Sequence, residues 1–306
     1  MSRPTELLSR LAHLRVDRKR DNVAPHKPAL LLALLDLIDR SELPAGHAGG
    51  GGLEVALTPE LAFTFATFGG VAMHRRSQKL RPEMPFYHLH SDGLWTPLTA
   101  DGREATSRAD VARARLATDF AAALADPAFR QAARRVLIET YFEPSERTSL
   151  YELVGLDRSQ TTPPPPSLSG ERLAAAVRRG RDARFRLRVV TAYGYRCALT
   201  GYRLNTLSAG TLVDAAHIRP VAADGACDPT NGLALSKNAH WMFDEGLWTL
   251  TDDYHVQVAH RRFVESNPDG RGLADYHGRA LLLPDDRALW PRPEYLAWHR
   301  RHRFLG

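Results

Sequence analysis

Four polar residues in the second half of the chain have the types and spacing of a hydrolytic site. Asp214 lies three residues before His217, Asn231 follows 14 residues after His217, and His240 follows nine residues later. Hydrolysis of a phosphodiester needs a base that activates water and a cation that stabilises the developing charge. His217 suits the base because imidazole titrates near neutral pH. Asp214 and His240 can bind the cation, and Asn231 can hold the loop that carries the base. Two protein ligands would leave coordination positions for phosphate and water.

Short strands and a helix are expected to position these residues. Apolar runs predict strands over residues 212–215 and 233–235, and residues 237–243 predict a short helix. The first histidine then closes the first strand, and the second lies in the helix. Two more strand candidates, 247–251 and 255–259, flank a polar turn. The chemistry-bearing residues therefore belong to one compact strand–loop–helix unit.

This region resembles the HNH endonuclease family, which has a ββα-metal fold. The resemblance covers about residues 186–259. It rests on the ordered His217, Asn231 and His240, with the flanking patterns Ala-His-Ile-x-Pro and Asn-Gly-Leu-x-Leu. It implies that His217 is the general base, that Asn231 is the structural asparagine and that His240 is a metal ligand. It also implies that Asp214 is the acidic metal ligand, as in one subgroup of the family.

The metal expected at this site is Mg²⁺ or Mn²⁺, because aspartate, histidine and phosphate ligands suit hard or borderline cations. Other HNH enzymes place the acidic ligand directly before the base, where this chain has Ala216. Many HNH proteins near modification-dependent restriction enzymes bind a structural zinc through two Cys-x-x-Cys pairs. This chain has only Cys197 and Cys227, so a structural zinc is not expected. A zinc site that joins the two cysteines with histidines is the weaker alternative.

A proline run divides the chain into two expected domains. Residues 161–169 begin Thr-Thr-Pro-Pro-Pro-Pro-Ser, which favours an extended linker between a domain at 1–160 and an HNH domain at 170–306. The expected fold class is α+β: a mostly helical N-terminal DNA-reading domain with a small sheet, joined by the proline linker to an HNH (ββα-metal) domain. In the first domain, residues 57–69 are ambiguous, with a helix from residue 59 as one interpretation. The other elements expected there are helices over 5–15, 29–38, 108–125 and 127–142 and strands over 85–89 and 93–98.

The first domain is similar to the sulfur-binding domain of phosphorothioate-dependent McrA-type restriction endonucleases. The similarity covers about residues 5–155. It rests on residues 24–28, Ala-Pro-His-Lys-Pro, before an apolar helix, and on residues 84–89, Met-Pro-Phe-Tyr-His-Leu. In that family, an N-terminal domain of about this length is joined to a C-terminal HNH domain. The family commonly has tyrosine where this chain has Met84, and often arginine where it has Lys27.

A phosphorothioate carries a sulfur that is larger, softer and less hydrated than the oxygen it replaces. Its reader needs an apolar depression for the sulfur and cations around the phosphate. Pro85 and its neighbours can form the depression, and His26 and Lys27 can offer charge and N–H groups at a helix N-terminus. The run 74–76 and Arg108 can contact phosphates or guanine edges. The residues expected to bind DNA or sulfur are His26, Lys27, His74, Arg75, Arg76, Met84, Pro85, Phe86, Tyr87, His88 and Arg108. The ordinary alternative is that Phe86 and Tyr87 are core strand residues and that 74–76 is a solvated loop.

The distribution of charge also favours double-stranded DNA as the partner. The chain has 41 basic and 35 acidic side chains, a net charge of +6. Seven arginines and two acids fall within residues 171–188, where a helix is expected. An arginine-dense helix can contact the DNA backbone, although a solvated helix face is the alternative. No apolar run approaches the roughly 18 residues of a membrane span, and the first 20 residues lack the apolar stretch of a signal peptide. The protein is therefore expected to be soluble and cytoplasmic, without a membrane partner.

The leading hypothesis is a restriction endonuclease that binds phosphorothioate-modified DNA through its first domain and cuts nearby with its second. The runner-up is an HNH nuclease that reads another mark, such as methylcytosine, or unmodified sequence. A base reader would normally hold a flipped base in an aromatic cage, and Trp95 is the only tryptophan of the first domain. A non-catalytic DNA-binding protein with a degenerate nuclease fold is the third alternative. Double-strand cleavage by a one-site nuclease suggests a homodimer.

Overall fold

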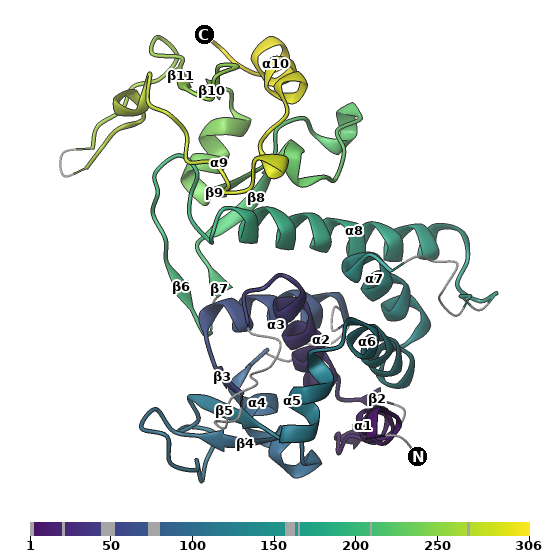
Figure 1. Ribbon diagram of the computed structural model, residues 1–306. Helices are drawn as coiled ribbons and strands as arrows, with labels where there is room; N and C mark the ends of the chain where they lie inside the picture. Colours follow the sequence, from purple (N-terminus) through teal and green to yellow (C-terminus); the bar gives the residue numbers. More distant parts are fainter. Residues whose placement is uncertain are drawn as a thin grey trace. The chain divides into compact units, whose positions relative to one another are not determined.

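The computed structural model divides into two compact units. The first comprises residues 1–183 and 206–210, and the second residues 184–205 and 211–306. The division falls within helix α8 (Gly170–Ala192), which is shown in Figure 1. Part of the expected linker, residues 161–162 and 165, lies outside the described residues, so the 161–169 boundary stays a prediction. The structure describes residues 3–19, 22–43, 53–72, 80–156, 163–164, 166–208, 210–267 and 270–306.

The first unit is built around one buried helix, α2 (His26–Asp39). Eleven of its 14 residues are buried because the run from Ala29 to Leu35 is wholly apolar. A helix that is apolar on every side must be enclosed by other elements, and α2 packs against three further helices of this unit. The helix expected over 29–38 is thus confirmed and begins three residues earlier. The other α-helices are α1 (Arg3–Ala12), α3 (Pro59–Ala72), α4 (Glu83–His88), α5 (Thr118–Leu124), α6 (Pro127–Tyr141) and α7 (Pro144–Val154).

A small antiparallel sheet completes the first unit, with strand order β3-β5-β4. The structure corrects the helix that was expected over residues 108–125, because that segment holds strand β5 and the short helix α5. Ala114 and Leu116 are buried in β5, while Arg115 bonds Glu54 across the sheet at 3.0 Å. Buried and exposed side chains alternate along β5, and this two-residue period is typical of a strand. The strands are β1 (Arg18–Lys19), β2 (Asn22–Val23), β3 (Glu54–Ala56), β4 (Trp95–Leu98) and β5 (Arg113–Leu116).

The strand expected over residues 85–89 is also wrong, because the segment forms helix α4 and the 3₁₀ helix Leu89–Asp92. Pro85 lies in the first turn of α4, where its missing N–H has no hydrogen bond to lose. The change of element decides which side chains share a face, because residues three or four positions apart share a face of a helix, whereas residues two positions apart share a face of a strand.

The second unit contains the ββα arrangement expected from the sequence. Strands β8 (Val213–His217) and β9 (Gly232–Ser236) pair antiparallel, and α9 (Lys237–Asp244) follows directly. Strands β10 (Trp248–Leu250) and β11 (Val256–Val258) also pair, which confirms both predicted strand pairs of this half. The remaining elements are β6 (Asn205–Thr206), β7 (Gly210–Thr211), α10 (Pro293–His302) and the 3₁₀ helices Val221–Ala223, Pro229–Asn231, Leu273–Tyr276 and Arg287–Leu289.

Helices and small sheets together confirm the α+β class. Helix α8 confirms the helical element expected for the arginine-rich segment. Five of the seven arginines there are exposed, namely Arg172, Arg178, Arg181, Arg184 and Arg188. No helix among the described residues is long and apolar enough to cross a membrane.

Candidate active site and nucleic-acid interface

The β8–β9–α9 unit brings the two predicted histidines to one pocket. His217 ends β8 opposite Gly232 of β9, and His240 lies in the helix that begins where β9 ends. Both histidines line a pocket of about 460 Å³. Its other lining residues are Ala215, Ile218, Pro220, Val221, Asp244, Glu245, His299 and Arg303. The chemistry predicted from the two histidines is therefore available at one place.

Close packing fixes the ring of His217. The imidazole stacks on Phe185, with ring centroids 3.8 Å apart and planes 11° from parallel. Its Nε2 atom lies 3.7 Å from the Sγ atom of Cys227. Gly232 lets α8 lie close to β9, because a Cβ atom at this position would overlap Val189 and lie 3.0 Å from the Phe185 ring. The glycine of the Asn-Gly motif thus lets α8 pack on the hairpin that carries the base.

Asn231 holds the loop that follows His217. Its side chain is fully buried. The Oδ1 atom accepts a hydrogen bond from the N–H of Arg219, and Nδ2 donates to the carbonyl oxygens of Arg219 and Ala226, each at 2.9 Å. Gly225 leaves room for this network, because a Cβ atom there would overlap the Arg219 carbonyl. A single amide therefore ties three backbone groups of the loop together.

We expect Asn231→Ala to lower the free energy of unfolding of the second unit by about 2–4 kcal/mol. The substitution leaves buried backbone groups without partners, each at about 1–3 kcal/mol. Denaturant unfolding followed by far-UV circular dichroism measures the change. Asn238→Ala is the matched control, because Asn238 is exposed on α9. Equal stability of the two variants would contradict the loop-holding role.

His299, which the sequence did not single out, also lines the 460 Å³ pocket but is unsuited to carry protons. Burial lowers the pKa of His299 to about 4. Nε2 donates to the carbonyl oxygen of Phe243 at 3.2 Å, so in the neutral ring Nδ1 accepts from the Thr249 hydroxyl at 2.9 Å. The ring also stacks on Phe243 at 3.8 Å. His299 is thus a neutral residue of the pocket wall.

The predicted metal ligands are only partly brought together. His240 lines the pocket, and its Nε2 atom lies 3.3 Å from Oδ2 of Asp244. Asp214 does not line the pocket, and its Oδ1 atom accepts a hydrogen bond from Nε of Arg186 at 2.6 Å. Within the described residues, no group of three or more His, Cys, Asp or Glu side chains could hold a metal ion. Only a site with few protein ligands fits this pocket.

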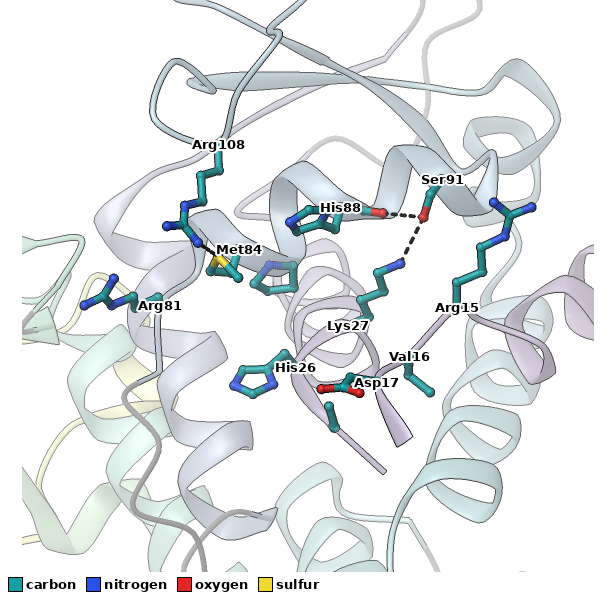
Figure 2. Close-up of a pocket in the computed structure, with 12 residues that line it drawn as sticks. Arg15, Val16, Asp17, His26, Lys27, Arg81, Met84, His88, Ser91 and Arg108 are labelled. Atoms are coloured by element: carbon teal, nitrogen blue, oxygen red, sulfur yellow. Dashed lines mark hydrogen bonds between the residues drawn. The ribbon is translucent and has the colours of Figure 1, made fainter. Parts of the chain in front are cut away.

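A second pocket, in the first unit, collects six of the residues expected to bind DNA or sulfur. It has a volume of about 550 Å³ and is shown in Figure 2. The six residues are His26, Lys27, Met84, Pro85, His88 and Arg108. Ala24, from the motif at residues 24–28, also lines the pocket. The sequence did not single out the other lining residues, which are Arg15, Val16, Asp17, Arg81 and Ser91.

The pocket combines apolar and cationic walls. Met84 and Pro85 belong to α4. Arg108 reaches Met84, with its Nη1 atom 2.7 Å from Sδ (Figure 2). In the same view, Arg81 lies on the Arg108 side of the pocket and Arg15 on the other side. Arg81 lies three residues before Met84. A basic residue so close to the Met-Pro motif could have indicated its place in the pocket.

Lys27 forms a buried ion pair with Asp92. Its Nζ atom lies 2.6 Å from Oδ2 of Asp92 and donates to the Ser91 hydroxyl at 3.2 Å. The two charged side chains are only 9% and 2% exposed. Lys27 therefore shapes the pocket wall instead of presenting a free ammonium. Burial, followed by the charge of Lys27, lowers the pKa of His88, so the neutral imidazole dominates at pH 7.

The helical form of α4 places two residues of the predicted set outside the pocket. Phe86 is fully buried, its ring lies 5.1 Å from that of Trp95, and its carbonyl oxygen accepts a hydrogen bond from Trp95. The expectation that Phe86 contacts DNA is wrong because it belongs to the core. Tyr87 does not line the pocket, and its hydroxyl donates to the Thr106 carbonyl at 2.9 Å. The run His74, Arg75 and Arg76 lies outside the described residues.

Comparisons with known proteins divide the chain in the same order. Residues 197–251 match the family model described as HNH endonuclease. Residues 67–159 match the family model described as ScoMcrA-like, DNA sulfur-binding domain. The second match includes Met84, Pro85 and Arg108 and begins after His26 and Lys27.

Among solved structures, the chain is similar to a modification-dependent TagI restriction endonuclease, with 22% sequence identity and a TM-score of 0.31. That similarity covers 40% of this chain and 38% of the other. No curated protein that was compared matches the chain. The two family matches support the resemblances seen in the sequence: the chain carries a ScoMcrA-like DNA sulfur-binding domain followed by an HNH endonuclease domain.

Proposed function

We propose that this chain is a modification-dependent restriction endonuclease. It binds phosphorothioate-modified double-stranded DNA through the 550 Å³ pocket and hydrolyses a phosphodiester nearby at the HNH centre. The observation that carries the proposal is the composition of that pocket. Apolar Met84 and Pro85 stand beside Arg81 and Arg108, in a chain whose other domain presents His217 and His240 to a second pocket. Because the proposed substrate is DNA, a cytoplasmic location is part of the proposal.

The first pocket suits a phosphorothioate because it serves both parts of that group. The sulfur is poorly hydrated, so contact with Pro85 and the thioether of Met84 removes little favourable hydration and buries apolar surface. The arginines offer planar guanidinium groups to the charged phosphate. Charge contacts act on modified and unmodified DNA alike, whereas the apolar wall favours only the sulfur. Discrimination is therefore assigned to Met84 and Pro85.

At the HNH centre, His217 removes a proton from water as the water oxygen attacks phosphorus and the bond to the leaving oxygen breaks. Stacking on Phe185 holds the imidazole plane fixed during this transfer. Asn231 fixes the loop after the base through its three backbone hydrogen bonds. His240 would hold a divalent cation, Mg²⁺ or Mn²⁺, which supplies positive charge to the phosphate and leaving oxygen when bound.

The pocket around His240 fits such a cation. A carboxylate oxygen of Asp244 lies 3.3 Å from its Nε2 atom, and both side chains line the same hollow. Two protein ligands leave the remaining positions to phosphate and water, as a catalytic site requires. One centre cuts one strand at a time, so two chains on opposite strands would allow both strands to be cut in one binding event. A homodimer on DNA is therefore part of the proposal.

Cleavage of matched plasmids tests the proposal. We expect a plasmid that carries phosphorothioates to be nicked or linearised in the presence of Mn²⁺ or Mg²⁺, and the same plasmid without sulfur to remain supercoiled. Gel electrophoresis over a time course provides the measurement, and excess chelator is expected to stop the reaction. Equal cleavage of both plasmids would instead favour a nuclease that reads sequence or another mark. Tight binding of the modified plasmid without cleavage would favour a non-catalytic DNA-binding protein.

A further inference from the structure

Helix α9 presents two metal-binding side chains on one face. His240 and Asp244 are four positions apart, which places them one above the other on a helix. Their nearest ring nitrogen and carboxylate oxygen are 3.3 Å apart. Neighbouring ligands of one cation, each about 2.1 Å from it, are separated by roughly 3.0–3.4 Å. The two side chains thus already have the separation of ligands to a shared ion.

Both side chains are accessible from the pocket that contains His217. The side chain of His240 is 27% exposed and that of Asp244 is 60% exposed. A cation held between them would face the hollow that His217 also lines. That position leaves room for a phosphate beside the proposed base. A catalytic cation needs such open coordination positions.

The position of Asp244 on its helix has an electrostatic cost. It is the last residue of α9, and a carboxylate at a helix C-terminus faces the negative end of the helix dipole. The sequence order, histidine first and acid four residues later, is also the less favourable orientation for a helical ion pair. Asp244 therefore adds little to the stability of α9, so its placement needs another explanation.

Asp214, in contrast to Asp244, lies outside the pocket and is bound to an arginine. It precedes His217 by three positions on β8, and an odd spacing on a strand places two side chains on opposite faces. Ala215, two positions before His217, does line the pocket. The Asp214 carboxylate accepts a hydrogen bond from Nε of Arg186 at 2.6 Å. A divalent cation placed there would be repelled by the guanidinium group.

We propose that Asp244, together with His240, holds the divalent cation of the HNH centre, and that Asp214 is a structural partner of Arg186. The inference rests on the proposed metal-dependent HNH function and revises the ligand set implied by the sequence resemblance. Imidazole and carboxylate together suit Mn²⁺ at least as well as Mg²⁺. The pair leaves the imidazole of His217 to act as the base.

Binding of Mn²⁺ to the full chain without DNA tests this assignment, because it requires neither cleavage nor phosphorothioate recognition. Electron paramagnetic resonance of free Mn²⁺ gives the Kd. We expect Asp244→Asn to raise the Kd at least about tenfold, since even indirect partners of a metal change affinity about 10- to 100-fold. Asp214→Asn, which removes the same charge from outside the pocket, is expected to remain within about twofold of the parent chain.

Two further measurements separate a ligand from a structural residue. The midpoint of thermal unfolding of Asp244→Asn should equal or exceed that of the parent, because the variant removes a charge from the helix C-terminus. Asp244→His, which restores a ligand at the same position, should recover Mn²⁺ binding. Weakened binding in Asp214→Asn with unchanged binding in Asp244→Asn would overturn the inference, as would the absence of a saturable Mn²⁺ site in the parent chain. Cleavage of unmodified DNA would refute only the proposed sulfur recognition.

Discussion

Replacement of His217 by alanine is expected to slow DNA cleavage by about 10²–10⁴-fold, the usual contribution of general acid–base catalysis. The imidazole stacks on Phe185 within the pocket that His240 also lines, so its loss removes the base and leaves the other residues of the site in place. The pocket for modified DNA lies in the other unit and shares no residue with this site. Affinity for modified DNA should therefore be unchanged.

Single-turnover cleavage in Mn²⁺ and a gel shift in the absence of metal measure the two parts of this prediction. His255→Ala is the matched control, because His255 is a half-exposed histidine of the same unit beside Asp253. Added imidazole should restore part of the rate of His217→Ala by occupying the space left beside Phe185. Cleavage by His217→Ala at the parental rate would reject His217 as the base.

The sequence was sufficient to predict the strands and helix that carry the two histidines of the HNH centre, because the information there is local. His217 and Gly232 face each other across one hairpin, and α9 follows β9 without a loop. Short motifs therefore predicted the β8–β9–α9 arrangement and the elements that carry both histidines. The same holds for α2, where an unbroken apolar run indicates a buried helix.

Contacts between distant segments were not visible in the sequence. Strand β5 is a strand because it pairs with β3 and β4, and its four residues alone do not exclude a helix. The partner of Lys27 is Asp92, 65 residues away, so the loss of a free ammonium could not be anticipated. The partner of Asp214 is Arg186, 28 residues earlier, and a motif that counts spacing along the chain does not include it.

Phosphorothioate recognition gives the second large expected effect. With the full chain carrying His217→Ala, we expect a duplex with one phosphorothioate to bind at least about tenfold more tightly than the same duplex with oxygen. Burial of about 40–60 Å² of sulfur surface at ~25 cal/mol/Å² contributes about 1–1.5 kcal/mol, close to the 1.4 kcal/mol of a tenfold ratio. A gel shift with the two matched duplexes at physiological salt measures the ratio.

Single variants distinguish the contribution of the apolar wall to binding from that of the cations. Met84→Ala and Pro85→Ala are expected to reduce the ratio of affinities, because they remove contacts that favour sulfur. Arg108→Ala is expected to weaken binding to both duplexes and to reduce the salt dependence by about one charge. Tyr87→Phe is the control, since its hydroxyl bonds Thr106 outside the pocket.

Lys27 is a poor choice for substitution in this binding test. Its replacement by alanine would leave Asp92 as a buried charge without its partner, at a cost of about 3–5 kcal/mol, so weaker binding would follow from a damaged fold. Variants of Met84 and Arg108 avoid this problem. Equal affinity for the two duplexes would overturn sulfur recognition and leave a nuclease that reads another feature of DNA. The HNH centre would stand in that case, because His217, Asn231 and His240 belong to the other domain and are tested by measurements that do not depend on sulfur.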